Sequence, residues 1–269
     1  MRLLLFVLIL LYNCTAWGQE KISGTIKSAS GHAVEYATIS VDSIFTLSDS
    51  NGKFSLFIPK STKHNIHITH ISYKPLVISQ NATNNGNLNI TLEEAINELS
   101  NITITNTNKK NSKLKAITGK GMRIPGGNVR FINEHNGTKE IGSIIKVNKD
   151  FVINNVTLKI LSNSYTKCTL RIIIYRLEGK QVTPISTKPL YAEAKRSKDS
   201  YTLNFSINQQ INLNKGHKYF IGLAIVDASE KGELNIPAHI HSGLGHNTLT
   251  GKTKKIPASI GLKIWGRYE

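Results

Sequence analysis

The sequence is poor in cysteine. It contains two cysteines, Cys14 and Cys168, in 269 residues. Cys14 belongs to an apolar N-terminal segment, and removal of that segment leaves Cys168 without a partner for an intrachain disulfide. Cys168 alternates with Leu170 and Ile172 along one face of an apolar run, as expected of a small buried hydrophobic residue. A disulfide framework is therefore excluded, and no neighbouring residue favours a metal or redox role for this thiol.

Acidic residues are also scarce. There are 17 aspartates and glutamates against 34 lysines and arginines, which gives a net charge of +17. So few carboxylates give no sign of the paired acids of a glycosidase, and no nucleophile elbow is present. The basic excess suits an anionic partner, such as an acidic glycan or the phosphates of lipopolysaccharide. Compositional drift is the alternative, because asparagine, isoleucine and lysine are abundant together, as in proteins from AT-rich genomes.

Long apolar runs are absent apart from the N-terminus, where Leu3 to Leu11 follows Arg2. This run is too short for a membrane helix, and small residues at Ala16 and Gly18 form a cleavage site. We therefore expect residues 1–18 to be a secretory signal peptide. A lipoprotein signal acylated at Cys14 is the alternative, but Asn13 stands where such signals have a small residue. The chain is expected to reach the periplasm, the outer-membrane surface or the extracellular space, with no later transmembrane segment and no nucleic-acid partner.

Helical periodicity is nearly absent as well. One short helix is predicted from Thr91 to about Leu99, on a capping-box pattern. Before it, short alternating runs predict strands, and Asp49-Ser50-Asn51-Gly52 predicts a hairpin turn. These strands lie at Lys21–Ile26, Tyr36–Val41, Lys53–Ile58, Asn65–Ile71 and Leu88–Leu92. Short, evenly spaced strands are typical of a β-sandwich.

The segment from Asn106 to Gly121 has little apolar content and predicts a linker. Alternation then resumes, and about eight antiparallel strands in the second half predict a jelly-roll-like sandwich. They are expected near Val129–Ile132, Ile141–Val147, Phe151–Ile160, Cys168–Tyr175, Tyr201–Ile207, Tyr219–Asp227, Leu234–His241 and Ser259–Trp265. The expected organisation is all-β: signal peptide 1–18, first sandwich 19–104, basic linker 105–122 and jelly-roll-like sandwich 123–269.

Two features are candidates for binding. The first is a run of basic residues with no acidic residue among them, in and beside the linker, suited to an anionic polymer. Its members are Lys109, Lys110, Lys113, Lys115, Lys120 and Arg123. The second is Trp265, which alternation places on the same face as Lys263, where an indole beside a lysine suits a sugar ring. An edge-covering role is the alternative for this tryptophan.

Three patterns resemble catalytic or metal sites and do not satisfy their requirements. Five residues separate Gly245 from Gly251 before Lys252, whereas a phosphate-binding P-loop has four. His32 and Glu35 have the spacing of a zinc peptidase, but the further ligand and base of such a site are missing. His239 and His241 share a face without a cysteine beside them. No catalytic residue, no metal and no cofactor is expected.

The first half resembles the carboxypeptidase-regulatory-like domain, a transthyretin-like sandwich. The resemblance is carried by Ile22–Ile26, Gly31, Ala37–Val41, Ser48–Pro59 and Ile71–Lys74. It implies a non-catalytic module of the kind that also opens many TonB-dependent outer-membrane receptors. The stretches Glu140–Val147 and Leu170–Tyr175 are similar to an uncharacterised sandwich that accompanies this module in envelope proteins.

The basic composition, the expected signal peptide and the family resemblance of the first half together indicate an exported, non-catalytic envelope protein. We expect it to act as a surface binding module for a glycan or an anionic polymer. The alternative is a structural or scaffolding partner of an outer-membrane complex, such as a TonB-dependent receptor.

Overall fold

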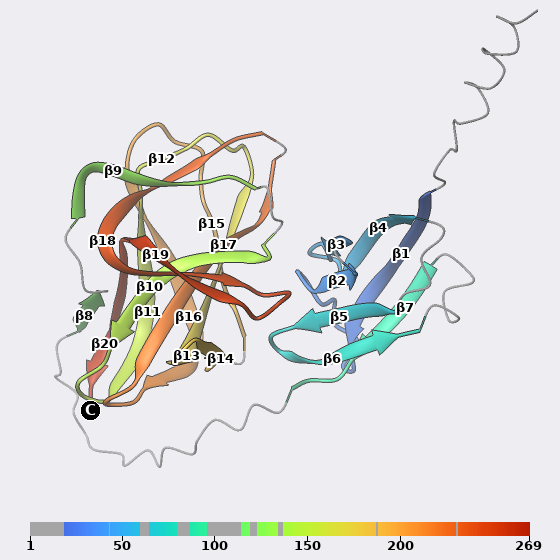
Figure 1. Ribbon diagram of the computed structural model, residues 1–269, viewed down its shortest axis with the longest axis horizontal. Coiled ribbons are helices and arrows are strands. Elements are labelled where there is room, and N and C mark those ends of the chain that lie inside the picture. The colour runs from blue at the N-terminus through green and yellow to red at the C-terminus, as the bar shows by residue number, and fades with distance from the viewer. Residues whose placement is uncertain are drawn as a thin grey trace, which may run out of the picture. The chain divides into compact units, whose positions relative to one another are not determined.

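The computed structural model describes residues 19–42, 44–59, 65–79, 87–95, 114–118, 123–133, 137–186, 188–229 and 231–269. Every regular element in these ranges is a β-strand, and Figure 1 labels the strands in chain order. Contacts divide the chain into two compact units, Met1–His70 with Pro75–Glu93, and Ile71–Lys74 with Glu94–Glu269. The prediction of an all-β protein is confirmed.

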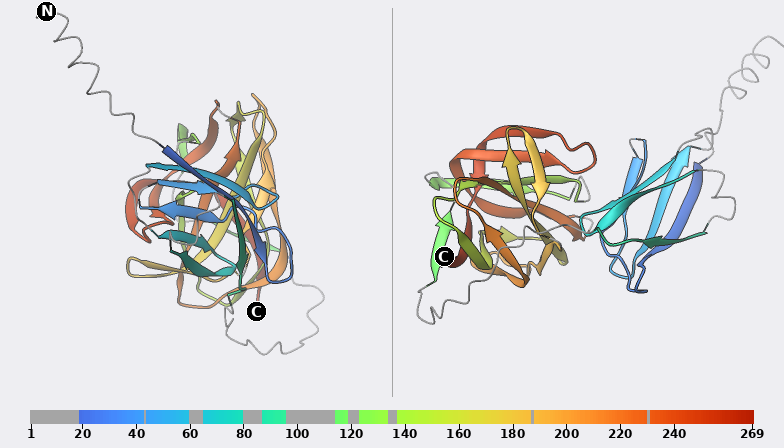
Figure 2. Two further views of the ribbon diagram at one scale, coloured as in Figure 1. Left: turned by 90° about the vertical axis from the view of Figure 1, so that its right-hand side faces the viewer. Right: turned by 90° about the horizontal axis from the view of Figure 1, so that it is seen from below.

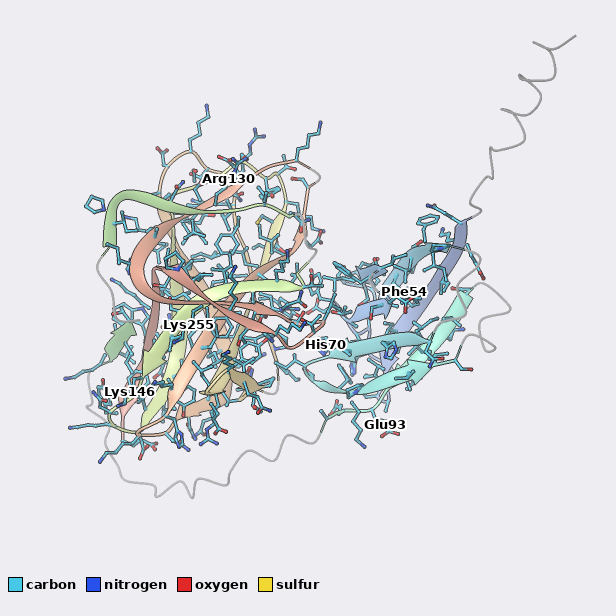
Figure 3. All side chains as sticks on the ribbon, viewed as in Figure 1. Phe54, His70, Glu93, Arg130, Lys146 and Lys255 are labelled. Carbon is cyan, nitrogen blue, oxygen red and sulfur yellow. The ribbon has the colours of Figure 1, made fainter. Side chains whose placement is uncertain are left out.

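The first unit is a sandwich of two small sheets. One sheet has the order β4-β1-β7 and the other β3-β2-β5-β6. The strands are β1 (Gln19–Ser28), β2 (Thr38–Val41), β3 (Ile44–Leu47), β4 (Lys53–Pro59), β5 (Ile66–His70), β6 (Tyr73–Ile78) and β7 (Asn87–Leu92). Strict alternation buries Phe54, Leu56 and Ile58 of β4, and Phe54 is labelled in Figure 3. The opposing sheet buries Ile39 and Ile68, so the core lies between the two layers.

The hairpin turn before β4 forms as its residues predict. Gly52 has a φ of 75°, and a Cβ at this position would lie 2.3 Å from the carbonyl oxygen of Ile26. The Asp49 Oδ1 accepts hydrogen bonds from the backbone N–H groups of Asn51 and Lys53, both at 2.8 Å. Glycine is therefore required on steric as well as conformational grounds.

The second unit is a larger sandwich. A nine-stranded sheet contains the path β12-β18-β10-β17-β13-β14, with β9, β15 and β19 attached, and a four-stranded sheet has the order β16-β11-β20-β8. The first eight strands are β8 (Lys115–Thr118), β9 (Arg123–Phe131), β10 (Lys139–Lys146), β11 (Phe151–Ile160), β12 (Ser162–Asn163), β13 (Cys168–Glu178), β14 (Gln181–Pro184) and β15 (Leu190–Glu193). The others are β16 (Tyr201–Leu213), β17 (Lys218–Ala228), β18 (Leu234–Asn247), β19 (Thr253–Ile260) and β20 (Leu262–Tyr268). Both views in Figure 2 show this unit as strands joined by loops.

The chain alternates between these two sheets in the manner of a jelly roll. β10 and β13 flank β17 in the larger sheet, whereas β11 pairs with β16 in the smaller one. The side chains that point between the sheets form one apolar core, which includes Val156, Leu158 and Phe205. Cys168 is a buried member of the same core, and burial raises the pKa of its thiol to about 12.

Three local expectations are corrected by the strand pairing. Thr91 lies in β7, where it pairs with Lys27 of β1 in a parallel ladder, and residues 96–99 of the expected helix lie outside the described residues. Within the expected linker, Lys115–Thr118 form β8, which pairs with β20. The strand expected over Ser259–Trp265 is two strands, because β19 pairs with β18 and β20 pairs with β11 in the other sheet.

Candidate functional site

The four-stranded sheet turns a polar surface away from the core. On β11, Val156 and Leu158 point inward, so the intervening Thr157 points outward. The same alternation applies on β16 and β20. The outward residues Asn155, Thr157, Lys159, Thr202, Asn204, Lys263 and Trp265 line a hollow with a volume of about 430 Å³. We call this set the Trp265 face.

The pairing register fixes the neighbours of Trp265. It lies opposite Asn155 of β11 on one side and Ala116 of β8 on the other. Its indole Nε1 donates a hydrogen bond of 3.0 Å to the hydroxyl of Thr157. The side chain is half-buried, so the indole is held in position while part of it remains accessible. The prediction that Trp265 and Lys263 share an outward face is confirmed by this register.

The charge of the Trp265 face is positive. Lys159 and Lys263 contribute ammonium groups, and none of the described residues that line the hollow is acidic. Thr157 lies directly between Asn204 and Lys263 in the pairing register. An indole, two ammonium groups and several hydroxyl and amide groups therefore converge on one side of a rigid sheet.

The predicted basic run is only partly within the described residues. Lys109, Lys110, Lys113 and Lys120 lie outside them. Lys115 is exposed at the start of β8 and pairs with Gly266, so it takes the opposite face of the sheet from Trp265. Arg123 begins β9, and its side chain lies outside the described set. The role assigned to this run stays a prediction.

A second polar cluster, which the sequence analysis missed, lies in the nine-stranded sheet on the side turned away from the core. The Glu140 carboxylate is completely buried and accepts hydrogen bonds from three side chains. These are Arg171 Nη2 at 3.2 Å, Tyr175 Oη at 2.7 Å and His246 Nδ1 at 2.9 Å. Arg171 Nη2 also donates to the carbonyl oxygen of Gly137 at 2.8 Å. We call these four side chains the Glu140 network.

The chemistry of the Glu140 network is that of a buried ion pair. Burial opposes the charge on Arg171, but Glu140, together with Tyr191 and Tyr175, outweighs that effect and raises the pKa of the guanidinium. Burial, reinforced by Glu140, raises the pKa of Tyr175 well above its ordinary value. Tyr175 therefore remains a protonated donor. Both carboxylate oxygens of Glu140 are engaged, which leaves this group poorly placed to accept a proton from a substrate.

The motifs that resemble catalytic sites have ordinary structural settings. The segment from Gly245 to Lys252 is the end of β18 and its turn into β19, closed by a hydrogen bond from the Asn247 N–H to the Lys252 carbonyl oxygen at 2.9 Å. Exposed His32 contacts Ser30 at 3.0 Å. Among the residues that the structure describes, no group of three or more His, Cys, Asp or Glu side chains is arranged to hold a metal ion.

The fold defines an all-β protein of two sandwiches, and comparison with known families assigns the first of them. Residues 22–104 match the family model of the CarboxypepD_reg-like domain. The first sandwich is thus a carboxypeptidase-regulatory-like domain, which is a regulatory and non-catalytic module. The predicted resemblance of this half is confirmed.

Comparisons with curated proteins and with solved structures give no further family assignment. No curated protein matches the chain. One solved structure that matches is the "Structure of infectious bursal disease virus Gx strain", with 12% identity and a TM-score of 0.30 over 93% of this chain. This chain spans 60% of the length of that viral chain, and a likeness this low supports no inference about fold or function. In the described part of the sequence, no helix is long and apolar enough to cross a membrane.

Proposed function

We propose that this chain is an exported, non-catalytic envelope protein that binds a glycan through the Trp265 face of its second sandwich. The observation that carries the proposal is the convergence of a fixed, half-buried indole with two lysines around one hollow. Its volume of about 430 Å³ lies within the range of about 300–1,000 Å³ that is common for small-molecule sites.

The residue types suit a carbohydrate ligand. An aromatic ring provides a flat apolar surface with a polar edge, which matches the apolar face and hydroxyl rim of a pyranose ring. Asn204, Asn155 and Thr202 supply amide and hydroxyl groups that can exchange hydrogen bonds with sugar hydroxyls. Lys159 and Lys263 favour sugars that carry a carboxylate or sulfate group. A rigid strand scaffold holds these groups in place before binding, which reduces the entropy lost on association.

Non-catalytic action is supported by the state of the best candidate acid. Glu140 is engaged on both oxygens by Arg171, Tyr175 and His246. The first sandwich belongs to a regulatory family. Export is supported by the N-terminal sequence, with its apolar run and small cleavage-site residues.

The test is glycan binding by the purified, tag-free chain, first on an array and then by calorimetry with the best ligand. We expect Trp265→Ala to weaken binding by about 2 kcal/mol, which is roughly thirtyfold. Phe57→Ala is the matched control, because Phe57 is an aromatic residue of the first sandwich that is 55% exposed. Equal affinity of the wild type and the Trp265 variant for every bound glycan would contradict the proposal.

A scaffolding role is the second candidate, and the exposure of Phe57 favours it. Phe57 projects from β4, which is an edge strand of the sheet β4-β1-β7 in the described residues. Exposed aromatic residues beside a free strand edge suit a protein partner. Cross-linking in native envelope distinguishes the two roles. A scaffold loses its cross-linked partner in the Phe57→Ala variant and keeps it in Trp265→Ala, whereas a glycan-binding module shows no Phe57-dependent partner.

A further inference from the structure

A second cavity, with a volume of about 870 Å³, opens in the nine-stranded sheet of the second unit. Its walls come from β9, β10, β17, β18 and β19. β18 pairs with β9 over its first half, with a register shift between Pro237 and His239, and with β10 over its second half. Figure 1 shows the long, curved path of β18 beside β9. In the part of the chain that the structure describes, the cavity shares no lining residue with the Trp265 face.

The interior of this cavity is apolar and continuous with the core. Phe131 and Ile225 line it, and both are buried members of the core cluster. Ile141 lines it as well and packs against the same cluster. Gly245 lies opposite Ile141 in the pairing register, and a Cβ built on it would be 3.7 Å from the nearest atom. A Cβ at Gly245 therefore makes only ordinary van der Waals contacts, and a larger side chain there would project into the cavity that Gly245 lines.

The rim of the same cavity is basic. Among the described residues, Arg130, Lys139, Lys252 and Lys254 line it, against a single acidic residue, Glu140. The charge of Glu140 is offset by Arg171, on the side of the sheet turned away from the core. Arg130 is labelled in Figure 3 and forms an ion pair of 2.7 Å with Glu233. The remaining cations of the rim are Lys139 of β10, Lys252 of the turn before β19, and Lys254 of β19.

We infer that this cavity binds an anionic amphiphile, with a single acyl chain in the apolar interior and a carboxylate head group at Lys252 and Lys254. An apolar interior with cations at its mouth is complementary to such a molecule, because it removes the chain from water and keeps the head group hydrated beside positive charge. The site is independent of the Trp265 face.

The first test is calorimetric titration of the purified chain with octanoate, decanoate and dodecanoate, each below its micelle concentration. One site per chain is expected, and each methylene that enters the cavity should raise the affinity about fourfold. Dodecyltrimethylammonium, which has the same chain and a positive head group, should bind at least tenfold more weakly than dodecanoate. Absence of dodecanoate binding, or equal binding of the cationic amphiphile, would overturn the inference.

Two variants locate the site. The double substitution Lys252→Gln with Lys254→Gln should lower dodecanoate affinity about tenfold and change dodecanol affinity less than twofold, because only the first ligand is charged. Gly245→Leu should weaken both ligands by filling the cavity. The matched control is Lys159→Gln with Lys263→Gln, which removes the same charge from the Trp265 face and should leave dodecanoate binding unchanged. If the Lys252 and Lys254 variant binds dodecanoate like the wild type, the assignment is wrong.

Discussion

The two polar clusters of the second sandwich differ in their access to water. The Trp265 face is built from half-buried and exposed side chains on the outward side of the four-stranded sheet. The Glu140 network is buried, and its carboxylate has no solvent exposure. In the first cluster the indole of Trp265 donates a hydrogen bond to Thr157, whereas in the second three side chains converge on Glu140.

This difference separates a surface suited to a ligand from a group that maintains the fold. Polar groups that face water exchange partners readily, so a ligand can replace their water at modest cost. A buried charge must be paired within the protein, and removal of one partner leaves the other unsolvated. Substitutions in the two clusters should accordingly affect different properties, namely binding for the Trp265 face and stability for the Glu140 network.

The largest effect is expected for Glu140→Gln. This change leaves Arg171 as a buried charge without its carboxylate, and Arg171 Nε already lacks a hydrogen-bond partner. The free energy of unfolding should fall by about 3–5 kcal/mol. Urea denaturation followed by tryptophan fluorescence measures the change.

The control is Glu233→Gln, which breaks the pair with Arg130. The side chains of that pair are 65% and 39% exposed, so the change should cost less than about 1 kcal/mol. Similar losses for the two substitutions would show that burial does not distinguish these ion pairs. A selective loss of glycan binding in Glu140→Gln, with stability unchanged, would instead make the network part of a binding site.

Alternation along single strands was enough to predict the outward position of Trp265 beside Lys263, and the general fold, but not the other members of the first cluster. Trp265 falls between Ile264 and Gly266 on β20, and the inward position of Ile264 fixes the outward position of its neighbour. The hairpin turn at Asp49–Gly52 follows from local backbone preference. Features of this kind depend on residues adjacent in sequence, and their prediction needs no knowledge of tertiary contacts.

The second cluster depends on distant residues and could not be predicted in the same way. Glu140 meets Arg171, Tyr175 and His246 across separations of 31, 35 and 106 residues. One signal was present, because Arg171 is a charged residue inside an otherwise apolar strand, Cys168–Tyr175, and such a residue needs a partner when buried. The partner's identity required the fold. For the same reason Thr91 was wrongly placed in a helix, since its pairing with Lys27 of β1 is remote in sequence.

A smaller effect is expected within the Trp265 face for Thr157→Val. The substitution keeps the side-chain shape and removes the acceptor of the indole hydrogen bond. This hydrogen bond contributes about 0.5–1.5 kcal/mol to holding the indole in its binding orientation. Its loss should therefore lower glycan affinity roughly threefold to tenfold. Stability should change by less than about 1 kcal/mol. Thr202→Val, on the same face but on β16, is the control. Equal affinity for the two variants would show that anchoring of the indole does not contribute to binding.

The smallest effect per residue is expected for substitutions in the basic run. Measuring this effect separates long-range electrostatic attraction from the local contacts of the Trp265 face. We predict that the chain binds an anionic polysaccharide at low salt, and that affinity falls at least about tenfold by about 0.2 M salt, because neutralised charges release counterions. Changing all six basic residues to Gln should remove most of the salt dependence. These residues are Lys109, Lys110, Lys113, Lys115, Lys120 and Arg123.

The matched control removes six positive charges that are exposed but scattered. It replaces Lys21, Lys27, Lys53, Lys146, Lys149 and Lys180 with Gln. Both variants have the same net charge, so attraction governed by net charge alone gives them equal slopes of log affinity against log salt. A local binding run gives a shallower slope in the first variant only, because clustered charges contact the polymer together. Equal slopes would mean that the run is a solvated segment and that the basic excess is compositional.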